Sequence, residues 1–195
     1  MGRKAVNKQR KQNLDKARPW VEKLIPGLTG QSLAKLTMAD FARIMGKSKS
    51  TVYEYFTSKE EILEYAVRLH IEKIEGFEAI FQGPQGKPRE EYEAVLALLA
   101  GGLDGITSAF LHELRTLFPT AWQPVEEVFE LVIAYFRQFH QHYMDQGVFK
   151  PTSLDLLTRM DSWFAFEFLL SHREDEALAD LLLAYIRMRF EGIML

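Results

Sequence analysis

The 195-residue chain contains no cysteine, which excludes disulfide bonds, thiolate metal sites and cysteine nucleophiles. No segment is long and apolar enough to span a bilayer, and the charged N-terminus lacks the apolar stretch that a signal peptide needs. Strand-like alternation bounded by hairpin turns is also missing, so we expect an all-α fold. The corresponding expectation is a cytoplasmic protein without membrane contact.

Charge is distributed unevenly along the chain, although the formal net charge is only −3. Residues 1–59 hold 13 basic and 4 acidic side chains, whereas residues 60–195 hold 11 basic and 23 acidic ones. Such asymmetry is expected when one end of a protein faces a polyanion, and a solvated basic tail is the alternative. We therefore distinguish a basic head, residues 1–59, from an acidic body, residues 60–195.

The head begins with residues 1–13, which are basic and poor in apolar side chains. We expect a mobile tail that adds non-specific attraction to a polyanion or enters a minor groove. Apolar residues at helical spacing predict a first helix over residues 14–25, and Pro26-Gly27 is expected to end it. Thr37 and Asp40 are spaced as a capping box for a second helix that ends at Gly46.

Ser48 is the expected cap of a third short helix, which runs to about Phe56, and Ser58 is the expected cap of a long fourth helix. The fourth helix continues to Phe81 and ends at a loop over residues 82–88. Later helices are expected over residues 89–100, 104–117, 124–145, 153–171 and 174–192. Gly101-Gly102 is interpreted as a helix break, because a phosphate-binding loop would continue into Lys-Ser/Thr.

Residues 36–63 carry the most specific pattern in the chain. Two short helices joined by a tight turn are the geometry that inserts the second helix into a DNA major groove. Apolar residues are spaced to pack the two helices together: Phe41, Ala42, Met45, Val52 and Phe56. Polar and aromatic residues are left around the N-terminus and the expected exposed face of the second helix: Lys47, Ser48, Lys49, Ser50, Thr51, Tyr53 and Tyr55.

This stretch resembles the helix-turn-helix of TetR-family transcription regulators. The matching residues are Thr37, Ala42, Gly46, Ser48, Lys49, Thr51, Val52, Tyr53, Tyr55, Phe56, Ser58, Lys59, Glu60 and Glu61. The resemblance implies phosphate contacts by Lys49, Tyr53 and Lys59, and base contacts by Ser50, Thr51 and Tyr55. The expected DNA-binding residues are Thr37, Lys47, Ser48, Lys49, Ser50, Thr51, Tyr53, Tyr55 and Lys59. It also implies two domains: a DNA-binding domain over residues 1–59, with a three-helix core, and a helical ligand-binding and dimerisation domain over residues 60–195.

The body is rich in aromatic residues, and bodies of this family commonly enclose a small-molecule pocket. We therefore expect an apolar cavity between the helices over residues 89–117, 124–145 and 153–171. The candidate ligand-binding residues are Phe110, His112, Trp122, Tyr135, Phe139, Trp163 and Glu167. A structural ion pair is the alternative for Glu167, since buried charges need partners.

Apolar residues form a stripe on the last expected helix, and the helix before it is apolar on nearly every side. Two such helices from each subunit can build a four-helix dimer interface. The expected interface residues are Leu178, Leu181, Leu182, Tyr185 and Ile186. The alternative is that both helices only close the core of the monomer.

The sequence predicts a homodimeric, sequence-specific transcriptional regulator that binds double-stranded DNA. A repressor released by a small apolar or amphipathic effector is the leading hypothesis. No cofactor or metal is expected, because His140 and His142 point away from each other on a helix and no further ligands accompany them. No nucleophile–base arrangement indicates an enzyme. Control by a protein partner, and an all-helical enzyme or lipid carrier, remain open as alternatives.

Overall fold

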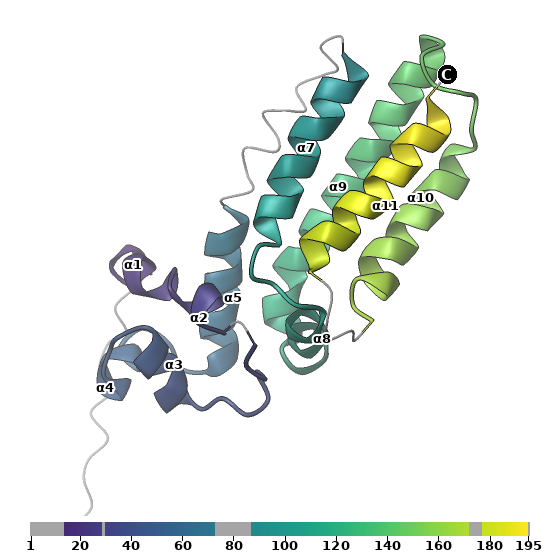
Figure 1. The fold of residues 1–195 in the computed structure, drawn as a ribbon. Coiled ribbons are helices and arrows are strands. Elements are labelled where there is room, and N and C mark those ends of the chain that lie inside the picture. Colours follow the sequence, from purple (N-terminus) through teal and green to yellow (C-terminus); the bar gives the residue numbers. More distant parts are fainter. Residues whose placement is uncertain (1–13, 29, 73–86, 172–176, 195) are drawn as a thin grey trace, which may run out of the picture.

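The computed structural model describes residues 14–28, 30–72, 87–171 and 177–194, and these ranges confirm the all-helical fold (Figure 1). They contain no strand, only an isolated bridge between Phe149 and Met194. The expected tail over residues 1–13 lies outside the described residues, as do most of the loop expected at 82–88 and the C-terminal part of the long fourth helix, with Ile74, Phe77 and Phe81.

The head contains a 3₁₀ turn, η1, and four short helices, followed by the longer α5. Their bounds are Leu14–Lys16 for η1, Arg18–Val21 for α1, Leu24–Leu28 for α2, Met38–Ile44 for α3, Lys49–Val52 for α4 and Lys59–Ile71 for α5. The expectation of one helix over residues 14–25 was wrong, because this segment is divided into three short pieces. Pro26 and Gly27 lie inside α2, where a proline in the first turn costs no helical hydrogen bond. A Cβ at Gly27 would overlap the Ile44 side chain, so glycine allows α2 to approach α3 closely.

Side-chain caps start α3, α4 and α5 as the sequence predicted. Thr37 Oγ1 accepts from the Asp40 backbone N–H, and the Asp40 carboxylate accepts from the Thr37 N–H at 2.9 Å, which completes the capping box. Ser48 caps α4 and Ser58 caps α5 in the same way. The third helix is shorter than expected, since α4 ends at Val52 and the chain continues in turns to Tyr55.

The body consists of α7 (Pro88–Gly102), α8 (Ser108–Leu117), α9 (Pro119–Asp145), α10 (Leu154–Trp163), a π-helical turn η2 (Phe164–Phe168) and α11 (Leu178–Ile193). Two expected boundaries were wrong. Gly101 and Gly102 remain helical, and the chain turns afterwards at Gly105, where φ is +71°. The long helix starts at Pro119, which suits the first helical position because its φ is fixed there.

In the body, α7, α9, α10 and α11 run side by side, and α8 lies at the end of this bundle that is nearer the head (Figure 1). Helix α5 packs along α9, and one buried apolar cluster extends from Trp20 and Phe56 in the head to Phe110 and Trp122 in the body. A second buried cluster fills the far end of the bundle around Tyr92, Phe139 and Phe190. Head and body therefore share a core, and the domain boundary at residue 59 stays a prediction. None of the described helices is long and apolar enough to cross a membrane.

Candidate nucleic-acid interface and ligand cavity

Helices α3 and α4 form a helix-turn-helix that is held by its buried side chains. Phe41, Val52 and Phe56 are fully buried, and Met45 is 1% exposed. Gly46 makes the turn with φ +65°, a backbone conformation that other residues rarely adopt. These local features fix the orientation of α4 on the head.

The outer face of α4 and the two residues before it present lysines and hydroxyl groups to solvent. Lys47, Ser48, Lys49 and Ser50 are exposed, and Thr51 is half-buried. The hydroxyl of Ser48 lies 2.9 Å from that of Ser50 and 2.8 Å from that of Thr51, so the three form one hydrogen-bonded cluster. Small hydroxyls of this kind can approach base edges, while lysines can reach phosphates.

Tyr53 belongs to the same exposed face. Its side chain is 47% exposed, and the Lys49 ammonium lies 5.8 Å from the centre of its ring. Lys47 takes a similar position 5.9 Å from the ring of Trp20. The ammonium groups of both lysines therefore lie beside aromatic rings, and both side chains are exposed.

The structure corrects the expected positions of two candidate DNA contacts. Tyr55 is only 8% exposed, because its ring packs edge-on against Trp20 at 5.4 Å, so it belongs to the core of the head. Lys59 donates from Nζ to the Leu36 carbonyl at 2.8 Å and lies 5.4 Å from the centre of the Phe118 ring. Lys59 therefore joins the head to the body. The Thr37 hydroxyl is likewise used within its own capping box.

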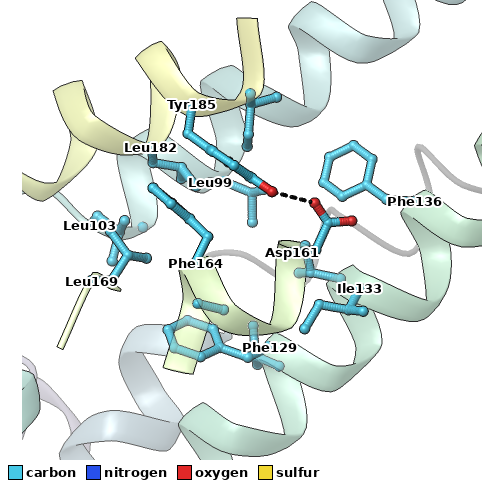
Figure 2. Close-up of a pocket in the computed structure, with 15 residues that line it drawn as sticks. Leu99, Leu103, Phe129, Ile133, Phe136, Asp161, Phe164, Leu169, Leu182 and Tyr185 are labelled. Atoms are coloured by element: carbon cyan, nitrogen blue, oxygen red, sulfur yellow. Dashed lines mark hydrogen bonds between the residues drawn. The ribbon is translucent and has the colours of Figure 1, made fainter. Parts of the chain in front are cut away.

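A cavity of about 90 Å³ lies inside the body between α7, α9, α10, η2 and α11 (Figure 2). Its wall is almost entirely apolar and includes Leu99, Phe129, Ile133, Phe136 and Phe164. The Phe164 ring stacks on the ring of Tyr185, with 3.9 Å between the ring centres. The π-helical turn contributes to this wall, because Phe164 and Ala165 both line the cavity.

The charged group on the cavity wall is Asp161, which is 8% exposed. Its Oδ1 accepts from the Tyr185 hydroxyl at 3.0 Å, and its Oδ2 accepts from Arg189 Nη2 at 2.7 Å. Burial raises the pKa of the Asp161 carboxyl, and the Arg189 guanidinium opposes that shift. Burial also raises the pKa of Tyr185, so its hydroxyl keeps its proton and remains a donor.

Arg189 continues this buried polar network away from the cavity. Its Nη1 donates to His140 Nε2 at 2.9 Å, and its Nε is buried without a hydrogen-bond partner. Burial, with the nearby guanidinium as the second cause, lowers the pKa of His140 to about 3. His140 is therefore neutral and accepts a hydrogen bond from Arg189 in the core of the body.

The seven ligand-binding candidates from the sequence do not line this cavity. Phe110 lines a second apolar cavity of about 70 Å³ between α5, α8 and α9. His112, Trp163 and Glu167 are exposed, Tyr135 is half-buried, and Trp122 and Phe139 are buried in the core. Asp161 and Arg189 were missed because their pairing depends on how α10 faces α11, which helical periodicity does not specify.

The stripe predicted for the dimer interface faces the interior of the subunit. Leu178 is 1% exposed and Ile186 4% exposed, and Leu182 and Tyr185 line the cavity. Leu181 packs against the same core. These side chains contribute to the core of the body, as the alternative proposed, and their place in a dimer interface stays a prediction. The outer faces of α10 and α11 instead expose Leu156, Met160, Trp163 and Met188.

Two hydrogen-bonding residues of α8 connect the head with the cavity wall. Glu113 accepts from the Ser32 hydroxyl at 2.7 Å and from the Ala34 N–H at 3.3 Å, in the segment before α3. Arg115 donates to the Phe166 carbonyl of η2 at 2.8 Å. Nearby, Glu60 of α5 accepts from the Thr120 N–H in the first turn of α9 at 3.0 Å.

The fold and its exposed α4 surface define a helix-turn-helix protein with an all-helical body. Residues 29–66 match the profile of the family described as bacterial regulatory proteins, tetR family. Over 110 residues the chain is 27% identical to YvaF of Bacillus subtilis (strain 168), an HTH-type transcriptional regulator described as uncharacterized. That alignment covers 54% of this chain and 58% of the relative, so it spans less than two thirds of YvaF.

Solved structures extend the likeness to the whole fold. KstR2 of Mycobacterium tuberculosis, a ketosteroid transcriptional regulator, is 15% identical with a TM-score of 0.64, over 95% of this chain and 98% of that one. FadR of Bacillus subtilis, a transcriptional regulator solved with stearoyl-CoA, is 17% identical with a TM-score of 0.63. That match covers 91% of this chain and 99% of FadR. The chain is therefore similar to the tetR family of bacterial regulatory proteins over residues 29–66, and its fold is similar to that of solved transcriptional regulators. All of these similar proteins are named as transcriptional regulators.

Proposed function

We propose that this protein is a homodimeric transcriptional repressor of the TetR family that binds double-stranded DNA through α4 and leaves it when an apolar effector enters the body. The observation that carries the proposal is the α4 surface, where Lys47, Lys49 and the Ser48–Ser50–Thr51 hydroxyl cluster are presented on a rigidly packed support. Charges that reach phosphates supply affinity, and hydroxyls that reach base edges supply sequence preference.

The proposed dimer uses the outer faces of α10 and α11. Leu156, Met160 and Trp163 are 55%, 39% and 58% exposed, and their spacing of four and three residues places them on one face of α10. Met188 on α11 is 62% exposed. Exposed apolar residues that gather on one face mark an interaction surface. We assign it to a second copy of the chain, because two recognition helices about 34–36 Å apart can read successive major grooves.

The proposed effector site is the cavity around Asp161. Its apolar wall fits a small hydrophobic molecule with few polar groups. The names of KstR2 and FadR connect those two proteins with a ketosteroid and with stearoyl-CoA, and this supports a ligand with a large apolar part in a body of this fold. The ligand of this chain is inferred from its own cavity wall.

The contacts of α8 offer a physical link between the two sites. A ligand that displaces Phe164 or Ala165 moves the η2 turn, and Arg115 ties the Phe166 carbonyl of that turn to α8. On the same helix, Glu113 holds the segment that leads into α3. Release of DNA requires that the effector prefers the arrangement that binds DNA poorly, and DNA must then weaken effector binding by the same factor.

The proposal is tested by selecting bound sequences from random duplex DNA and measuring binding of the full-length protein by fluorescence anisotropy. We expect the selected site to be bound about 10³-fold or more tightly than scrambled DNA at physiological salt. Equal affinity for the two DNAs would contradict sequence-specific regulation. Sedimentation of the complex should show two protein chains on each selected duplex, and one chain on each duplex would contradict the homodimer.

A further inference from the structure

Asp161 gives the cavity a chemical preference that its apolar wall alone would not have. A carboxylate offers about four acceptor positions on its two oxygens. The Tyr185 hydroxyl and Arg189 Nη2 occupy one position on each oxygen. Asp161 therefore retains acceptor capacity at the cavity wall, in surroundings that are otherwise apolar. Figure 2 shows the carboxylate with the Tyr185 hydroxyl directed at it across the cavity lining.

The charge balance around Asp161 limits what can bind there. The carboxylate and the Arg189 guanidinium form a buried ion pair with side chains 9% and 4% exposed, so the pair is already neutral. A ligand carboxylate would add a second buried anion beside Asp161, and a ligand ammonium would add an uncompensated buried cation. Both are costly in an apolar environment. A neutral hydrogen-bond donor adds no charge.

We propose that the cavity recognises a neutral apolar molecule bearing one hydroxyl group, an alcohol or a phenol, whose O–H donates to the Asp161 carboxylate. Asp161 is a specificity-determining residue in this assignment, and Arg189 keeps it ionised and in place. The inference rests on the proposed effector site and names the chemical class of its ligand. It distinguishes this chain from a binder of free fatty acids, whose carboxylate the site rejects.

Three probes of similar shape test the assignment: p-cresol, p-xylene and p-toluate. The cavity is of the same order of size as the ~150 Å³ engineered cavity that binds benzene, so single-ring probes are suitable. Isothermal titration calorimetry on the full-length protein at pH 7 should show p-cresol binding about tenfold more tightly than p-xylene, with p-toluate weakest. This ratio corresponds to one hydrogen bond to a charged acceptor.

Substitutions test whether the preference for p-cresol over p-xylene depends on the Asp161 side chain. Asp161→Asn should reduce the ratio of p-cresol to p-xylene affinity by about tenfold, because the charged acceptor is lost. Tyr185→Phe should preserve the ratio, since Asp161 Oδ1 loses a competing donor and keeps its acceptor role. Tyr143→Phe is the matched control, because it removes a hydroxyl that bonds Glu91 from a buried ring outside the cavity.

Several results would overturn the assignment. Equal affinity for p-cresol and p-xylene, or tighter binding of p-toluate, refutes hydroxyl recognition and leaves the effector cavity intact. If the ratio of p-cresol to p-xylene affinity is unchanged in Asp161→Asn, another residue recognises the hydroxyl and the role of Asp161 is refuted. If Asp161→Asn does not fold, the order of the three probes on the wild type and on Tyr185→Phe still decides.

Other results would contradict the proposed function and not the hydroxyl preference. Binding of p-cresol with no change in affinity for the selected DNA would refute control by this cavity and leave hydroxyl recognition standing. If none of the three probes binds, both the effector cavity and the hydroxyl preference are refuted. The measurement of DNA binding does not depend on either of them.

Discussion

Acidification should destabilise the protein through His140, which is fully buried against Phe136, Phe139 and Phe149. Arg189 Nη1 donates to its Nε2 at 2.9 Å. Protonation would remove this acceptor and place a second cation beside the guanidinium. The folded state therefore binds a proton at His140 only below about pH 3, whereas the unfolded chain binds one near pH 6.5.

The magnitude follows from these two pKa values. Because the folded-state pKa is depressed, the unfolded state takes up the proton first, and stability is lost as the pH falls from about 6.5 toward 3. One pKa unit corresponds to about 1.4 kcal/mol. At pH 5 the contribution of His140 is therefore about 2 kcal/mol less favourable than at pH 7, and it is nearly constant above pH 7.5.

Urea unfolding at a fixed protein concentration and a series of pH values measures this effect. His140→Gln keeps a polar acceptor but does not titrate, so its loss of stability between pH 7 and pH 5 should be smaller than that of the wild type by about 2 kcal/mol. His112→Gln is the control, since His112 is exposed. Equal pH profiles for the wild type and His140→Gln would refute the account of His140 as a buried neutral acceptor.

Three further experiments test the packing of head, body and dimer. Tyr55→Ala should cost about 3–5 kcal/mol in urea unfolding, as for other buried aromatic rings, without changing the preferred DNA sequence; a relaxed preference would restore its role in base contact. Trp163→Glu should shift sedimentation toward monomer, whereas Leu117→Glu, at a residue that is also exposed but lies on α8, should not; a dimer in both would refute the α10 interface. Ser32→Ala and Glu113→Gln together should show a coupling free energy of about 1 kcal/mol in a double-mutant cycle, and additivity would refute that contact.

The head could be predicted from the sequence because its signals are local. The capping box of Thr37 and Asp40, the caps Ser48 and Ser58, and the left-handed turn at Gly46 each act within a few residues. Such signals place helix starts and a turn without knowledge of the rest of the fold. The exposure of Lys47, Lys49 and Ser50 then follows from which residues must face inward.

The burial of Tyr55 and the contacts of Lys59 were not predictable in the same way. Tyr55 lies in the turn after α4, where helical periodicity no longer describes the chain, and Trp20 from α1 covers it. The contacts of Lys59 depend on Phe118, which is distant in sequence. Both positions are set by how the first helices and the body pack against the helix-turn-helix.

The cavity could not be predicted in detail, because its wall forms from contacts between residues that are far apart in the sequence. Its wall combines residues of α7, α9, α10 and α11, and the π-helical turn at Phe164–Phe168 changes which side chains face inward after α10. Asp161 and Arg189 lie 28 residues apart and meet only when α10 and α11 pack together. Aromatic density indicated the correct region of the chain, but not which side of each helix forms the wall.

Salt-dependent DNA binding of three variants tests whether the exposed face of α4 reads DNA. On the selected site and on scrambled DNA, Lys49→Ala should weaken binding to both and reduce the salt slope by about one unit. Lys59→Ala should leave that slope unchanged, because its ammonium contacts Leu36 and Phe118. Thr51→Ala should cost about 1–3 kcal/mol on the selected site alone. If the wild type binds both DNAs equally and the Lys49 and Thr51 variants behave like it, α4 is not the recognition helix.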